Sequence, residues 1–190
     1  MTTLVIVSGA PASGKTTISR RLENDLGIPV LAKDDIKEML FDRLPQYDRD
    51  WSTIEGRMAI AMMYAGASQL LNAGYHVIVE SSFNPEHSRP EIAQMIAGRE
   101  IDVMEVYCTL EHEVRQQRWS ERAQTTRHPG HMDSSVQELT VRTEDSPLYP
   151  DSAMSIDTGL SPPLYEDRYQ EICAAIKETL GTGGRYETTN

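Results

Sequence analysis

A chain of 190 residues fits one domain of ordinary size, and we expect residues 1–181 to form it around a continuous core. The formal net charge of −11 and the pI near 4.9 disfavour a polymeric nucleic acid as partner, because neutralising many phosphates needs clustered Lys and Arg. No apolar run reaches the roughly 20 residues of a membrane span, and no basic leader precedes the first predicted strand, so we expect a cytoplasmic protein without a membrane partner.

The first predicted elements are a strand, a loop and a helix. Residues 4–7 are a short, β-branched apolar run, which is typical of a strand buried on both faces of a parallel sheet. A glycine-rich loop follows directly. Ile18, Leu22 and Leu26 then recur at helical spacing, and Gly27 stands where a helix C-cap belongs.

The same alternation continues to the end of the chain. Further strands are predicted at residues 29–32, 75–79, 101–108 and 153–156. Helices are predicted at residues 34–44, at 54–74 (marked by Ile54, Met58, Ala61 and Ala65), at 85–97, at 110–127 and at 165–180. This order predicts an α/β fold of three layers with a mainly parallel five-stranded sheet. Residues 127–163 are the least regular part and predict long loops, and residues 182–190 predict a disordered tail.

The isolated cysteines and histidines favour structural roles. Cys108 and Cys173 have apolar neighbours within predicted elements, where a free thiol packs as a small hydrophobe in a reducing compartment. His76, His87 and His112 are expected at the surface.

Residues 9–16 match the pattern G-x-x-x-x-G-K-[ST] of a phosphate-binding P-loop. The two glycines allow a tight turn whose N–H groups converge on phosphates, the lysine adds a point charge, and the threonine hydroxyl can ligate Mg²⁺. The alternative is a glycine-rich turn that only happens to contain lysine, but the position between a buried strand and an amphipathic helix favours the P-loop. We therefore predict bound ATP and Mg²⁺. The predicted nucleotide-binding residues are Gly9, Ala12, Ser13, Gly14, Lys15, Thr16 and Thr17, with Thr16 as the metal ligand.

Two carboxylates follow the second predicted strand, at the sheet edge that carries the loop. Asp34 or Asp35 could accept a proton from an attacking hydroxyl there, and we choose Asp34. Both could instead stabilise the start of a helix. Glu80 ends the strand at 75–79, where it could orient Mg²⁺ or hold a substrate hydroxyl, or could simply be solvated.

A polar helix is predicted to form a lid at about residues 110–135. Arg115, Arg118 and Arg122 fall on one helix face and could stabilise charge on a departing phosphoryl group. The alternative is a solvated helix in which the interleaved glutamates pair with these arginines. The following segment, with His128, His131 and Asp133, could bind a metal, but it has few ligands for one, and a loop that contacts phosphate or turns the chain is the other interpretation.

With these residues in view, the chain resembles the small P-loop kinases grouped with polynucleotide 5'-hydroxyl kinases, zeta toxins and chloramphenicol phosphotransferase. The resemblance extends from Leu4 to about Leu180 and rests on residues 9–17, 33–37 and 80–86 and on the arginine-bearing lid. It implies a P-loop fold like that of nucleoside kinases with a helical lid.

The same resemblance implies roles for individual residues. It makes Asp34 the base that activates the acceptor hydroxyl, and it makes Arg118 and Arg122 the lid groups that act on the transferred phosphate. From the P-loop pattern itself, Lys15 is predicted to be a further catalytic residue. The resemblance also implies that Lys37 and Arg89 help to hold the acceptor. Our predicted set of acceptor-binding residues adds Asp34, Arg57, Glu80, Arg127 and His128. Lys37 and Glu80 depart from the arginine and aspartate that are more usual in the group.

Three functions remain open from the sequence. The first is an ATP- and Mg²⁺-dependent kinase that phosphorylates a hydroxyl of a small-molecule acceptor. The second is a polynucleotide 5'-hydroxyl kinase, which the acidic charge disfavours. The third is an NTP-binding regulatory or toxin-like module whose partner is a protein.

Overall fold

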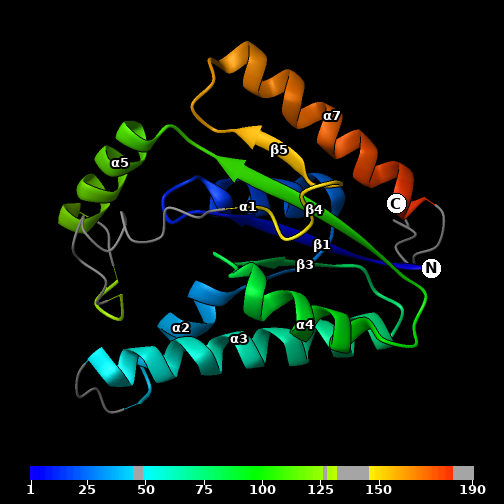
Figure 1. The fold of residues 1–190 in the computed structure, drawn as a ribbon, viewed down its shortest axis with the longest axis horizontal. Helices are drawn as coiled ribbons and strands as arrows, with labels where there is room; N and C mark the ends of the chain where they lie inside the picture. The colour runs from blue at the N-terminus through cyan, green and yellow to red at the C-terminus, as the bar shows by residue number, and fades with distance from the viewer. Residues whose placement is uncertain (45–48, 126–127, 132–145, 182–190) are drawn as a thin grey trace.

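The computed structural model describes residues 1–44, 49–125, 128–131 and 146–181. A five-stranded sheet lies between two layers of helices (Figure 1). All its strand pairs are parallel, and the strand order is β2-β3-β1-β4-β5. The strands are β1 (Thr2–Gly9), β2 (Val30–Ala32), β3 (Val77–Glu80), β4 (Ile101–Thr109) and β5 (Met154–Asp157). The predicted three-layer α/β fold is therefore confirmed.

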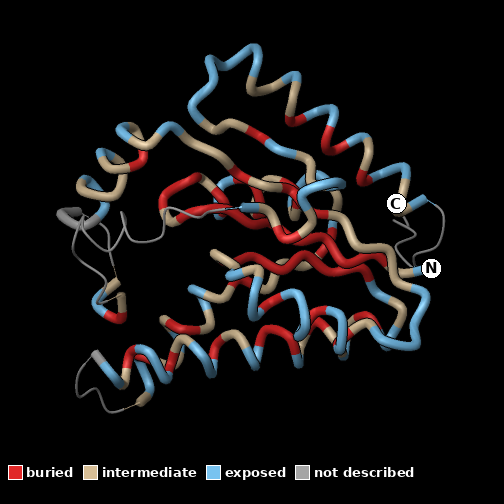
Figure 2. The backbone as a smooth tube through the Cα atoms, in the orientation of Figure 1, coloured by how far each residue is buried: buried red, intermediate tan, exposed pale blue. Residues whose placement is uncertain are grey.

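The helices cover both faces of this sheet. They are α1 (Lys15–Leu26), α2 (Lys33–Phe41), α3 (Arg49–Asn72), α4 (Pro85–Ile96), α5 (His112–Thr125) and α7 (Pro162–Leu180). Helices α1 and α7 pack on one face, against Val5 and Val7, whereas α3 and α4 pack on the other, against Leu4 and Ile6. Figure 2 shows the buried centre of the sheet between these two layers. Within the described ranges no helix combines the length and apolar character that crossing a bilayer requires.

The strand at the centre of the sheet sets the position of the site. β1 pairs with β3 on one side and with β4 on the other. After β3 the chain therefore crosses over β1 to form β4 on its other side. At such a reversal of strand order the carboxyl ends of parallel strands border a crevice. The loop after β1 lies at that crevice, as do the starts of α2 and α4.

Helix α3 forms where predicted, but its core-facing side differs from the expected one. Ile54 and Met58 are 44% and 39% exposed, whereas Glu55, Ala59 and Met63 are buried. Ile54 and Met58, the larger residues of the apolar pattern that predicted this helix, thus point outward. The helix turns a mixed face inward because it packs against both α2 and the sheet.

One histidine prediction was wrong. His76 is buried, and its Nδ1 accepts a hydrogen bond from the Thr3 N–H at 2.9 Å. Burial lowers the pKa of His76, which favours the neutral ring that this bond needs. His87 is exposed as predicted, and His112 is half-buried. Both cysteines are buried and free, as expected.

Candidate active site

The loop between β1 and α1 has the backbone geometry of a phosphate cradle. Gly9 has φ of +133°, and a Cβ there would lie 2.3 Å from the Cys108 carbonyl oxygen. Gly14, the N-cap of α1, has φ of +88°. Side chains other than glycine are strained in both conformations. The turn thus brings its backbone N–H groups to the positive end of the α1 dipole, which is a ready site for phosphate.

Two side chains of the loop fit this role. Lys15 is only 7% exposed, and its Nζ donates to the Ala10 carbonyl oxygen at 2.7 Å. Among the described residues, the buried Ser13 Oγ has no hydrogen-bond partner. A buried hydroxyl without a partner is costly unless a ligand accepts its proton. A phosphate oxygen would do so.

The side chains of Thr16 and Glu80 bring a hydroxyl and a carboxylate together. The Thr16 hydroxyl donates to Glu80 Oε2 at 3.2 Å. Glu80 is buried, and burial raises its pKa, although Lys15 and the Thr16 hydroxyl oppose the rise. A hydroxyl and a carboxylate are ligands that Mg²⁺ accepts, and a divalent cation would stabilise this buried carboxylate.

The two carboxylates at the start of α2 point in different directions. Asp34 lines the same cavity as Lys15, and its Oδ1 accepts from Lys33 Nζ at 2.9 Å. Asp35 instead pairs with Arg20 of α1. Of the two candidates for a base, only Asp34 lines the cavity, so the geometry favours Asp34.

The charge state of Asp34 follows from its neighbours. Although the Asp34 side chain is 56% exposed, partial desolvation by the surrounding protein raises its pKa, and the adjacent Lys33 lowers it through both charge and a hydrogen bond. His131 and Lys15 lower it further, so the pKa lies below its ordinary value. Asp34 is consequently a carboxylate at neutral pH, which is the form that can accept a proton.

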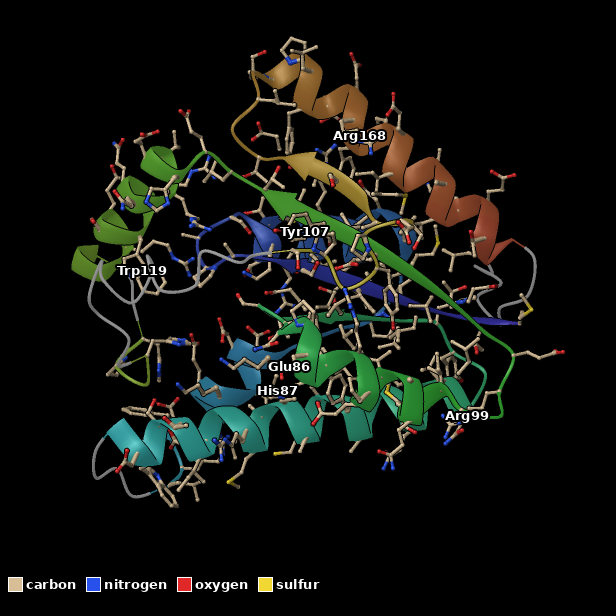
Figure 3. All side chains as sticks on the ribbon, viewed as in Figure 1. Glu86, His87, Arg99, Tyr107, Trp119 and Arg168 are labelled. Carbon is tan, nitrogen blue, oxygen red and sulfur yellow. The ribbon has the colours of Figure 1, made fainter. Side chains whose placement is uncertain are left out.

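A cavity of about 1630 Å³ joins the loop to these groups. The predicted site residues that line it are Ala12, Gly14, Lys15, Thr16, Thr17, Asp34, Lys37, Arg57, Glu80, Arg118 and Arg122. His87 at the start of α4 and Trp119 on α5 line it from two different sides (Figure 3). The sheet edge, both helical layers and α5 thus contribute walls.

Four predicted residues do not line this cavity. Gly9 ends β1, and Ser13 is buried within the loop. Arg89 donates from Nε to the Leu148 carbonyl oxygen at 2.5 Å. His128 contacts Asp42 and is considered below. Arg127 lies outside the described residues.

Two of the three arginines of α5 reach the cavity. Arg118 donates to both the hydroxyl and the carbonyl oxygen of Thr158, at 3.2 Å each, and Arg122 is exposed at the rim. Arg115 is buried and contacts His112 at 3.3 Å beside a smaller, separate cavity. The expected row of three arginines facing the site was therefore wrong for Arg115, which packs back toward the end of β4.

The segment at residues 128–131 contacts α2. His128 Nε2 lies 3.2 Å from Asp42 Oδ1, and His131 Nε2 lies 2.9 Å from Glu38 Oε1. Within the described ranges no cluster of three or more His, Cys, Asp or Glu residues could hold a metal ion. Asp133, the third ligand of the metal hypothesis, lies outside them.

Thr158 and Ser52 line the cavity and escaped prediction. Thr158 follows β5 at the carboxyl edge of the sheet, so the argument that found Asp34 could have found it. Ser52 reaches the site through contacts between distant parts of the chain, such as its bond to the Gly130 carbonyl oxygen, for which the sequence carries no signal. His131, which the sequence placed in a loop that could bind a metal or contact phosphate, also lines the cavity.

The family of the chain follows from comparison with known proteins. The model of the AAA domain family AAA_33 matches residues 4–143, so the chain belongs to that family. No curated protein sequence matches it significantly.

Solved structures agree on the fold. A crystal structure of a Chloroflexus aurantiacus protein, provisionally described as a kinase, is 33% identical and has a TM-score of 0.83, covering 93% of this chain and 97% of its own. The Sinorhizobium meliloti gluconokinase is 17% identical with a TM-score of 0.58, covering 94% and 95%. The APS kinase CysC of Mycobacterium tuberculosis, solved with AMPPNP and APS, is 20% identical with a TM-score of 0.58, covering 93% and 98%. The fold is that of the P-loop kinases.

Proposed function

We propose that the protein is a cytoplasmic kinase that uses ATP and Mg²⁺ to phosphorylate a hydroxyl group of a small, polar acceptor. The observation that carries this proposal is that Asp34 and Lys15 line one cavity, with Asp34 held as a carboxylate. A phosphate cradle alone would also serve a switch. A carboxylate facing the cradle supplies what phosphoryl transfer to a hydroxyl requires.

The cradle residues have distinct tasks in this proposal. Bound ATP would supply the phosphoryl group, and Mg²⁺ would offset charge on its phosphates. The backbone of residues 9–14 would hold the phosphates, Lys15 would turn from the Ala10 carbonyl toward them, and Thr16 and Glu80 would hold the metal.

Asp34 would act on the acceptor. Its carboxylate would accept the proton of the attacking hydroxyl, while Lys33 keeps it ionised. Arg118 and Arg122 would approach the transferred phosphate from α5. Because guanidinium groups stay charged, they can stabilise negative charge there without proton transfer.

The acceptor end of the cavity favours a small polar molecule. We define it by the lining residues of α2 and α3 and of residues 81–91. Within this described set there is no Phe, Tyr or Trp, and hydroxyl, amide and charged groups dominate. Proteins that hold single-stranded nucleic acid stack its bases on aromatic side chains, so this end suits a hydroxylated metabolite or antibiotic better than an oligonucleotide.

Acceptor-dependent consumption of ATP tests the proposal. The intact protein with Mg²⁺ would be offered pools of nucleosides, sugars, aminoglycosides and other hydroxyl-bearing antibiotics, and 5'-hydroxyl oligonucleotides, with Lys15→Ala as control. We expect one small-molecule pool to raise turnover above the water-driven background in the intact protein alone. Stimulation by oligonucleotides would favour the polynucleotide kinase. Uniform background turnover despite tight ATP binding would favour the regulatory module.

A further inference from the structure

Residues 128–131, which we call the clasp, pack against α2 and its C-terminal end. The two histidines of the clasp reach Glu38 of α2 and Asp42, the C-cap of that helix, four residues further on. Figure 1 shows the clasp beside α2 and the start of α3. The clasp therefore forms a wall at the end of the cavity that carries Asp34.

Gly130 fits closely within this wall. A Cβ on Gly130 would lie 2.8 Å from the ring of Phe41, so the clasp backbone lies directly on α2. The Gly130 carbonyl oxygen accepts a hydrogen bond from the Ser52 hydroxyl at 3.3 Å. Since Ser52 belongs to α3, the clasp is bound to both helices.

The Ser52 hydroxyl makes a second contact, with Lys37. Lys37 Nζ donates to Ser52 Oγ at 2.8 Å, and both side chains are 4% exposed. A hydroxyl has one proton to donate. Because Ser52 gives that proton to Gly130, its lone pairs must face the Lys37 ammonium. The clasp thus determines the orientation of Ser52, and Ser52 determines where the ammonium lies.

The position of Lys37 bears on the reaction. Lys37 is one helical turn from Asp34, and both side chains line the cavity. We propose that Ser52 is a positioning residue for the acceptor: it fixes the Lys37 ammonium, which binds an acceptor oxygen and so sets the hydroxyl against Asp34. This inference rests on the proposed kinase function and deepens it. It adds Ser52 and the Gly130 carbonyl to the acceptor site.

Amine labelling tests the arrangement without any acceptor. The chain has four lysines, Lys15, Lys33, Lys37 and Lys177, so acetylation by an N-hydroxysuccinimide ester can be followed at each by peptide mass spectrometry. Ser52→Ala removes a hydrogen bond to a charged group and should speed labelling of Lys37 roughly fivefold or more. Ser52→Thr keeps the hydroxyl and should retain the slow rate. The exposed Lys177 reports any general change.

The matched control is Ser68→Ala. Ser68 is on the same helix, and its hydroxyl also accepts from a cation, Arg99, at 3.2 Å, but it does not line the cavity. Its loss should leave the labelling rate of Lys37 unchanged. Equal rates for Lys37 in Ser52→Ala and Ser68→Ala would overturn the proposed orientation, as would fast labelling in Ser52→Thr.

Kinetics with the acceptor that the pooled assay identifies complete the test. Ser52→Ala should raise the KM for the acceptor roughly 10- to 100-fold while the KM for ATP is unchanged, and Ser52→Thr should restore it. An unchanged acceptor KM would refute the positioning role even if labelling had changed. If no pool stimulates turnover, the proposed function fails, while the labelling still decides whether Ser52 orients Lys37.

Discussion

The Thr158 hydroxyl donates to the Ser13 carbonyl oxygen at 2.9 Å, although 145 residues separate the two. The same hydroxyl accepts from Arg118 of α5. Thr158 is held in turn by its own N–H, which donates to the Thr109 carbonyl oxygen at 3.0 Å. One threonine after the last strand therefore joins the phosphate cradle, the proposed lid and the sheet.

Thr158→Val should weaken this junction. The variant keeps the shape of the side chain but removes one donor and one acceptor, so we expect the free energy of unfolding to fall by about 1–2 kcal/mol and the Kd for Mg²⁺–AMPPNP to rise several-fold. Urea unfolding and calorimetric titration would measure the two effects. Thr158→Ser keeps the hydroxyl and should retain most of the stability and most of the nucleotide affinity. A valine variant that binds nucleotide as tightly as the intact protein would show that the junction does not shape the cradle.

Glu105 should be a large stabilising contributor outside the site. Its buried carboxylate accepts from the Ser8 hydroxyl at 2.5 Å and from the N–H groups of Leu148 and Tyr149 at 2.9 and 2.8 Å. Glu105→Gln turns one acceptor into a donor that faces another donor. The free energy of unfolding, measured with urea, should therefore fall by about 1–3 kcal/mol.

The exposed Glu178 offers a matched control for that substitution. Glu178→Gln should change the free energy of unfolding by less than about 0.5 kcal/mol. Equal effects of the two substitutions would mean that the buried carboxylate does not anchor the segment at Leu148 and Tyr149.

Glu80 should make stability depend on pH. Its pKa is raised above the ordinary value of 4.5, chiefly by burial, so the folded protein holds this proton more tightly than the unfolded chain does. Stability from this group is therefore present below pH 4.5 and is lost as pH rises through the folded pKa. Glu80→Gln abolishes that loss, so the difference in unfolding free energy, variant minus intact protein, should grow from pH 4 to pH 7. A difference that is flat or shrinks over this range would refute the assignment.

Local patterns predicted much of the fold. The P-loop was predictable because its strand, glycine turn and lysine are contiguous in sequence, and Gly27 does adopt the left-handed C-cap conformation that ends α1. Asp34 was predictable because parallel strands end at one edge of the sheet. In both cases a short stretch of chain carries the whole signal.

Other features depend on packing between distant residues. Glu55 is buried and Ile54 exposed because α2 and the sheet, rather than the apolar pattern, fix the inward face of α3. Arg115 contacts His112 and lines the separate cavity at the end of β4, which helical spacing alone does not reveal. In the clasp, His128 contacts Asp42 across a sequence separation of 86, and His131 contacts Glu38 across a separation of 93. No local sequence pattern indicates either pair.

The most direct test of the proposed function compares Asp34→Asn with Asp35→Asn. The two residues are adjacent at the start of the same helix, but only Asp34 lines the cavity. We expect Asp34→Asn to lower acceptor-dependent phosphoryl transfer by about 10²- to 10⁴-fold, as loss of a general base does, with the Kd for Mg²⁺–AMPPNP nearly unchanged. Asp35→Asn should keep transfer within a few-fold of the intact protein. Undiminished transfer by Asp34→Asn, or equal losses in the two variants, would contradict the assignment of Asp34 as the base.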